Sequence, residues 1–147
     1  MMDSLLKSAT AEVEKETAPV KFTVNQPIKV DPCIITLVKS SEYKTNNEYT
    51  QPAEGMRFFA INVEYHNTST EGAVEVNPMQ WFLYDAEGYS YQMAFGDSKE
   101  PMLNAVTLNS GKKVKGWVTF EIPKDAKPVK AQFQPDMASG INVEIEL

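Results

Sequence analysis

The chain has 147 residues, a length that suits one domain and allows a buried core to form without disulfides or metal ions. Its formal net charge of −6 argues against a nucleic-acid partner, because a nucleic-acid surface requires clustered Lys and Arg side chains. The single cysteine, Cys33, excludes an intrachain disulfide, and no stretch of the sequence is apolar enough to span a membrane.

The first 20 residues differ from the rest of the chain. They contain the charged run Glu12, Glu14, Lys15 and Glu16, and their apolar residues form only a weak helical stripe. No signal peptide is visible at Met1. We interpret residues 1–20 as a linker or short N-terminal helix that leads into a domain of residues 21–147.

Short apolar runs bounded by turn residues follow, and each predicts a β-strand. The first is a segment of two pieces, 21–24 and 28–30, interrupted by Pro27, and 74–76 is a brief extended piece. The other predicted strands are 33–39, 56–67, 80–84, 89–92, 105–108, 111–122, 130–134 and 141–147. About eight or nine short strands with no strong helical period after residue 20 predict an all-β antiparallel sandwich.

The strand 111–122 is the most regular of these segments. Val114, Gly116, Val118, Phe120 and Ile122 fall on one face, because side chains alternate along a strand. The glycine in this row predicts either room for a bulky neighbour or a β-bulge. The opposite face is polar except for a tryptophan at position 117, which predicts that this face is partly covered.

Three stretches in this order resemble a known family. They are "EGMRFFAINVEYHNTST", "WFLYDAEGYSY" and "LNSGKKVKGWVTFEIPKD". Together they are similar to an uncharacterised family of immunoglobulin-like domains in secreted proteins and lipoproteins of Gram-positive bacteria, which is similar in fold to a small secreted mycobacterial antigen. The resemblance covers roughly residues 20 to 147. It implies an immunoglobulin-like β-sandwich, located outside the cell or anchored at its surface, with no established activity and no catalytic residues. We therefore expect a secretion signal or lipid anchor outside this sequence.

The sequence contains few candidates for a catalytic or metal-binding site. A Ser-His-Asp or Cys-His site would have to use His66, the only histidine, and this residue ends a strand while Cys33 lies in an apolar one. One histidine and one cysteine are too few for a zinc site. Asp85 and Glu87 bracket a turn and could meet calcium, but a hairpin turn is the favoured interpretation. We predict no enzyme, no cofactor and no metal site.

The loops are the better candidates for contact. Tyr43 and Tyr49 lie in the polar loop 40–55, and tyrosines among small polar residues are typical of binding loops on β-sandwiches. The alternative is that both rings fold back over the sandwich. The apolar residues of a second loop, 93–104, are expected to plug one end of the core. If successive strands alternate in direction, loops 40–55, 85–88, 109–112 and 136–140 share one end and loops 93–104 and 124–129 the other. The two aromatic loops would then not form one site.

These features predict a non-enzymatic, extracytoplasmic module that binds a protein or a cell-envelope component, with Tyr43 and Tyr49 as the contact residues. The alternative is an inhibitor or immunity-type partner of an enzyme, which would bind a single enzyme one to one. The third possibility is a hydrolase that uses acidic residues brought together by folding.

Overall fold

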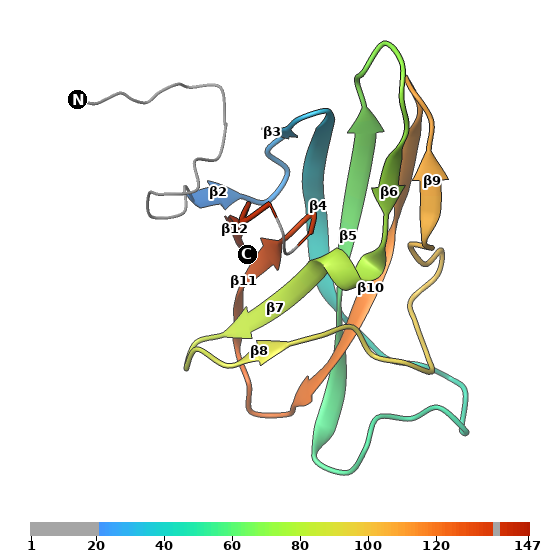
Figure 1. Ribbon diagram of the computed structural model, residues 1–147. Coiled ribbons are helices and arrows are strands. Elements are labelled where there is room, and N and C mark those ends of the chain that lie inside the picture. The colour runs from blue at the N-terminus through green and yellow to red at the C-terminus, as the bar shows by residue number, and fades with distance from the viewer. Residues whose placement is uncertain (1–20, 137–138) are drawn as a thin grey trace, which may run out of the picture.

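The computed structural model describes residues 21–136 and 139–147, which form an all-β sandwich (Figure 1). The prediction of a linker or short helix in residues 1–20 lies outside the described residues. Eleven strands occur in the described ranges, more than the eight or nine expected, because short pieces that a proline or turn interrupts pair as separate strands. A single turn of 3-10 helix, η1 (Pro78–Gln80), precedes β7.

One sheet has four strands in the order β10-β5-β4-β3. Their bounds are β3 (Ile28–Val30), β4 (Cys33–Tyr43), β5 (Met56–Asn67) and β10 (Lys113–Pro123). All neighbours are antiparallel, and β4 contains a register shift between Leu37 and Lys39. The predicted strand 33–39 is therefore too short, since β4 continues to Tyr43 as a partner of β5.

The second sheet has five strands in the order β2-β12-β11-β7-β8. Their bounds are β2 (Lys21–Thr23), β7 (Trp81–Asp85), β8 (Ser90–Tyr91), β11 (Pro128–Phe133) and β12 (Val143–Glu146). The pairing is antiparallel except between β2 and β12, which are parallel. A separate two-stranded ribbon consists of β6 (Val74–Val76) and β9 (Val106–Leu108).

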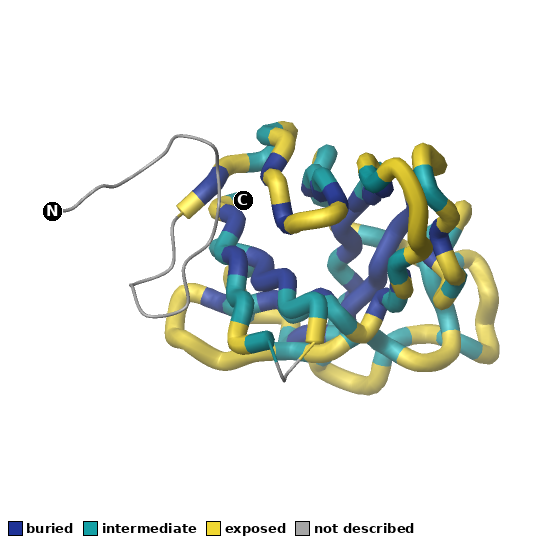
Figure 2. Tube along the Cα trace, turned by 45° about the horizontal axis from the view of Figure 1, so that its top comes forward, coloured by how far each residue is buried: buried dark blue, intermediate teal, exposed yellow. Residues whose placement is uncertain are grey.

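The core lies between the two main sheets (Figure 2). Alternate residues of each strand supply it, which is the expected consequence of side chains pointing to opposite faces. Tyr65, Trp81 and Phe133 form an aromatic cluster in which the Trp81 indole N–H donates to the Tyr65 hydroxyl at 2.9 Å, and this hydroxyl donates to Gln80 at 2.6 Å. Burial raises the pKa of Tyr65, so its hydroxyl is a neutral donor.

The opposite face of the four-stranded sheet is partly covered, as the tryptophan in β10 predicted. Trp117 is only 8% exposed, and the ammonium groups of Lys39 and Lys99 lie over its ring. The segment that follows β8 pairs with the free edge of β10: the Trp117 N–H donates to the Pro101 carbonyl and the Leu103 N–H donates to the Trp117 carbonyl, both at 2.9 Å. This segment also contacts Gly116, where a Cβ atom would lie 2.6 Å from the backbone of Leu103. The glycine therefore provides room for a neighbour, and β10 shows no bulge there.

Candidate functional site

Tyr43 is the last residue of β4 and does not lie in a free loop. Its ring lies beside Phe58 of the neighbouring strand, with the ring centroids 5.9 Å apart, and the side chain is half-buried. Its hydroxyl donates to Asp97 Oδ1 at 2.9 Å. Tyr43 thus folds back onto the sheet, which was the alternative interpretation of this residue.

Tyr49 shows the opposite behaviour. It is 87% exposed, in a loop whose backbone is held by side chains of its own. The Tyr49 N–H donates to Asn47 Oδ1 at 2.9 Å, and the Gln51 amide donates to the carbonyl oxygens of Thr45 and Asn47, both at 3.1 Å. An ordered loop that displays one exposed aromatic ring is suited to contact, because little conformational entropy remains to be lost.

Asp97 connects this loop to the segment that follows β8. Its carboxylate accepts hydrogen bonds from the hydroxyls of Thr50 at 2.6 Å and Tyr43 at 2.9 Å, and from the backbone N–H of Ser98 at 2.7 Å. Hydrogen bonding from Thr45 and Thr50, followed by Tyr43 and the Ser98 N–H, holds the pKa of Asp97 below its usual value. Partial burial and the hydrogen bond to Asp97 raise the pKa of Tyr43. At neutral pH the contact therefore joins a neutral phenol to a carboxylate, a charge-assisted hydrogen bond.

The two aromatic loops consequently lie side by side, and the prediction that they occupy opposite ends is wrong. The counting failed because the chain reverses within the loop 93–104. Met93 bridges Phe120 of β10 in an antiparallel sense, whereas Met102 bridges Trp117 of the same strand in a parallel sense. A count of strands assumes one change of direction at each loop, so it cannot detect an extra reversal of the chain inside a loop. The loop 109–112 was also misplaced, because Asn67, at the far end of β5, bonds to its backbone.

The prediction that loop 93–104 plugs the core is correct for part of the loop. Leu103 is fully buried, and Met93 packs against the core. Phe95, in contrast, is 79% exposed and stands two residues before Asp97. Since Thr50 and Asp97 are hydrogen bonded, Tyr49 and Phe95 are carried by two connected loops. We call these two exposed residues the aromatic pair.

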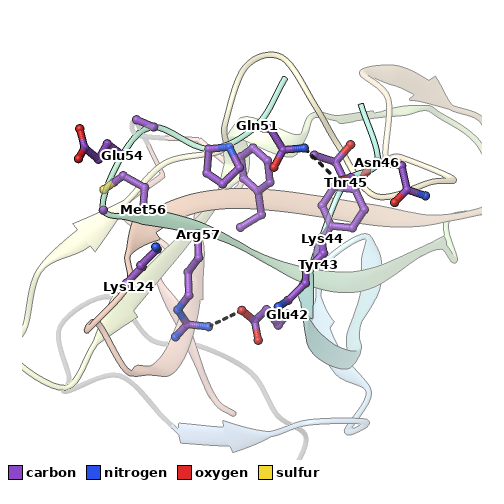
Figure 3. Close-up of a pocket in the computed structure, with 14 residues that line it drawn as sticks. Glu42, Tyr43, Lys44, Thr45, Asn46, Gln51, Glu54, Met56, Arg57 and Lys124 are labelled. Atoms are coloured by element: carbon purple, nitrogen blue, oxygen red, sulfur yellow. Dashed lines mark hydrogen bonds and ion pairs between the residues drawn. The ribbon is translucent and has the colours of Figure 1, made fainter. Parts of the chain in front are cut away.

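A groove of about 710 Å³ lies beside this junction (Figure 3). Its lining comes from the ends of β4 and β5, the loop between them, and Lys124 after β10. Arg57 donates to the Ala126 carbonyl at 2.8 Å and forms an ion pair with Glu42 at 3.9 Å. Its Nε is buried without a hydrogen-bond partner among the residues that the structure describes.

The remaining candidates are occupied by structural contacts. Asp85 Oδ1 accepts from the N–H groups of Glu87 at 2.9 Å and Tyr89 at 3.0 Å, and Oδ2 accepts from the Tyr91 hydroxyl at 2.7 Å. The hydrogen bond from Tyr91, followed by those from the backbone N–H groups, lowers the pKa of Asp85. Burial, together with the hydrogen bond to Asp85, raises the pKa of Tyr91 to about 12. Both carboxylate oxygens of Asp85 thus serve the hairpin turn. In residues 21–136 and 139–147, no group of three or more His, Cys, Asp or Glu side chains is placed to hold a metal ion.

Cys33 and His66 cannot act together. Ile34 is the partner of His66 across β4 and β5, and Cys33, one residue earlier, points to the opposite face of the sheet. Burial raises the pKa of the Cys33 thiol, which disfavours the nucleophilic thiolate.

Sequence reasoning missed Asp97, Phe95 as an exposed residue, and Arg57. Asp97 contacts Thr50 and Tyr43, which lie 47 and 54 positions earlier in the chain, and no local sequence pattern indicates such contacts. Phe95 lies in the segment "MAFGDSKEPML", in which Met93 and Leu103 do turn inward.

Comparison with known proteins agrees with the family resemblance. The sequence model of a family described as a domain of unknown function, DUF4352, matches residues 22–143. A search of the curated proteins found no match. None of the helices in the described part of the chain has the length and apolar character that crossing a membrane requires.

Several solved structures share the fold. The yjhA protein of Bacillus subtilis superposes with a TM-score of 0.67 at 20% identity, over 86% of this chain and 99% of that one. The secreted protein MPT63 of Mycobacterium tuberculosis gives a TM-score of 0.64 at 11% identity, over 90% of this chain and 100% of that one. The protein ycdA of Bacillus subtilis, described as a lipoprotein, gives 0.65 at 16% identity over 85% of this chain, which spans 38% of the length of ycdA. At these identities the likeness establishes the β-sandwich fold.

Proposed function

We propose that this chain, which belongs to the family of the domain of unknown function DUF4352, is a non-enzymatic, extracytoplasmic module that binds a protein or another component of the cell envelope. The observation that carries this proposal is the aromatic pair. Tyr49 and Phe95 are 87% and 79% exposed on two loops that the carboxylate of Asp97 joins.

Exposed aromatic side chains on an ordered surface favour binding. Each ring offers a large apolar area with few rotatable bonds, and such residues are enriched among the positions that dominate binding energies. Asp97 fixes the relative position of the two loops through Thr50 and Tyr43, so the partner does not have to order them. In this proposal Tyr49 and Phe95 contact the partner, and Tyr43 holds the two loops in position through its hydrogen bond to Asp97.

The proposed location outside the cytoplasm is supported by the structural relatives of the chain. One structural relative is described as a lipoprotein and another as a secreted protein. The use of a single, buried cysteine is compatible with such a location, because many surface proteins of this kind use no disulfides.

The absence of catalysis is likewise a proposal, supported by where the reactive groups lie. His66 and Cys33 point to opposite faces of a sheet, and both oxygens of Asp85 are bonded within a turn. The carboxylate of Asp97 accepts hydrogen bonds from Tyr43, Thr50 and the Ser98 N–H. A carboxylate held in this way is a poor general base.

The proposal is tested by measuring binding of the purified protein to isolated cell envelopes of the source organism by sedimentation. We expect the Tyr49→Ala/Phe95→Ala variant to bind at least about 30-fold more weakly, since an aromatic hot-spot residue contributes about 2 kcal/mol. The matched control is Tyr89→Ala, which removes another ring that is 64% exposed, at the turn between β7 and β8.

Equal binding by the double variant and wild type would disprove the assignment of the surface. Crosslinking with the same variants then identifies the partner. A single enzyme that is captured one to one and loses turnover on binding would replace our proposal by the inhibitor interpretation.

A further inference from the structure

The outer face of the four-stranded sheet, which points away from the core, carries a cluster of lysines. The strand register places Lys29 of β3 beside Ile34 of β4, and Ile34 beside His66, whose partner in β10 is Lys113. In the next row on this face Thr36 is paired with Glu64, whose other partner is Lys115.

The register shift in β4 adds a third row to this face. Cys33, Ile35 and Leu37 point into the core, so simple alternation would also direct Lys39 inward. The shift between Leu37 and Lys39 places the lysine opposite Asn62, in the row of Trp117, where its ammonium lies 5.7 Å from the Trp117 ring centroid. The bulge thus moves one positive charge from the core side to the outer face.

We define the basic face as the exposed residues Lys29, Lys39, Lys113 and Lys115. Within these three rows the strands contribute one carboxylate, Glu64, and Asp31 at the edge forms an ion pair with Lys29 at 3.7 Å. The face is positive although the whole chain has a net charge of −6.

The basic face is charged and offers no apolar ring. Trp117, the aromatic residue of its third row, is only 8% exposed and lies beneath two ammonium groups, with Lys99 at 4.8 Å and Lys39 at 5.7 Å from its centroid. A partner that docks on this face would therefore meet it through charge and not through apolar contact.

We propose that the basic face binds the anionic headgroup surface of a phospholipid membrane. The two-dimensional spread of the lysines favours a planar partner over a linear one. From β3 to β10 the face is three strand spacings wide, about 14 Å, and its three rows extend over a similar length. A flat anionic surface meets all four ammonium groups at once, whereas a single extended polymer would follow one row. The acidic side chains elsewhere on the protein oppose binding weakly, because salt screens charges more than about 10 Å apart.

The test is the partition of the full chain between buffer and vesicles at physiological ionic strength. Phosphatidylcholine vesicles with and without phosphatidylglycerol are compared by sedimentation. We expect binding only to the anionic vesicles. The Lys39→Gln/Lys113→Gln/Lys115→Gln variant should bind about a hundredfold more weakly, since each lysine near an anionic surface contributes about a fivefold factor.

The matched control is Lys21→Gln/Lys124→Gln/Lys127→Gln. It removes the same charge from exposed positions in β2 and in the turn after β10. We expect a loss of less than about threefold. The Tyr49→Ala/Phe95→Ala variant should keep full vesicle binding, so this inference and the proposed function can fail separately.

Equal losses in the two lysine variants would show that only net charge matters and would overturn the proposal. So would equal binding to neutral and anionic vesicles, or no binding to either. Binding to inorganic polyphosphate that depends on the basic face, without binding to vesicles, would instead identify a linear polyanion as the partner.

Discussion

The Gly116→Ala variant tests whether the segment after β8 is part of the folded core. A Cβ atom at this position would lie 2.6 Å from both the N and Cα atoms of Leu103, and 2.9 Å from the carbonyl carbon of Met102. An ordinary contact begins at 3.4 Å, so the segment must move by at least 0.8 Å. These are backbone atoms, which cannot move aside as a side-chain tip does.

The cost of this movement can be estimated from the contacts it disturbs. The segment is held to Trp117 by two backbone hydrogen bonds of 2.9 Å, each of which contributes about 1 kcal/mol. Overpacking a core position costs about 1–3 kcal/mol, and Leu103 is fully buried. We expect the free energy of unfolding to fall by about 3 kcal/mol, which lowers the melting temperature by about 10 °C in a domain of this size.

Urea unfolding followed by Trp fluorescence measures the change, with Lys113→Ala as a control in the same strand. The control removes an exposed side chain and should change the free energy of unfolding by less than about 0.5 kcal/mol. Hydrogen exchange of the Leu103 and Trp117 amides reports the contact directly. If Gly116→Ala unfolds at the same urea concentration as wild type and both amides stay protected, the reasoning is refuted.

Three further outcomes follow from hydrogen-bonded polar groups. Tyr65→Phe should lower the free energy of unfolding by about 1–3 kcal/mol, because the buried indole N–H of Trp81 loses its acceptor. In the same urea unfolding assay, Asn67→Ala should lower the free energy of unfolding by at least as much, since this fully buried amide donates to the carbonyls of Gly72 and Leu108. Asp97→Asn should make the free energy of unfolding depend less on pH in the acid range, as measured by urea unfolding at several pH values. The carboxylate's lowered pKa stabilises the wild type above the unfolded-state pKa, and this stabilisation is lost as the pH falls through the folded-state pKa. A parallel loss in wild type and Asp97→Asn would contradict the assignment.

Much of the fold could be predicted because it depends on local patterns. The bounds of β3 and β5 match the predicted strands, and the turn after Asp85 has its glycine, Gly88, at a positive φ of 97°. Alternation and turn chemistry act between neighbours in sequence, so a single chain is enough to display them. The predicted cover over the face of Trp117 was also correct, since an apolar residue in a polar row indicates a hidden contact.

The candidate site could be predicted only in part. Tyr49 was placed correctly as an exposed ring in a polar loop, whereas Tyr43 was assigned to the same loop although β4 extends to it. The length of β4 depends on pairing with β5, which the local sequence "KSSEY" does not indicate. Asp97 escaped notice because a carboxylate after a glycine has no pattern of its own.

By itself, the sequence determined the strands, the turns, the inward-facing residues and the family. Tertiary structure alone decided which loops meet and which charges share a face. Strand periodicity is a property of one segment, but the junction at Asp97 and the basic face with Lys39 arise from contacts between segments far apart in the chain. The reversal within loop 93–104 brings Asp97 to Thr50 and Tyr43, and the one-residue shift in β4 turns Lys39 to the outer face, because a shift of one residue exchanges the two faces of a strand.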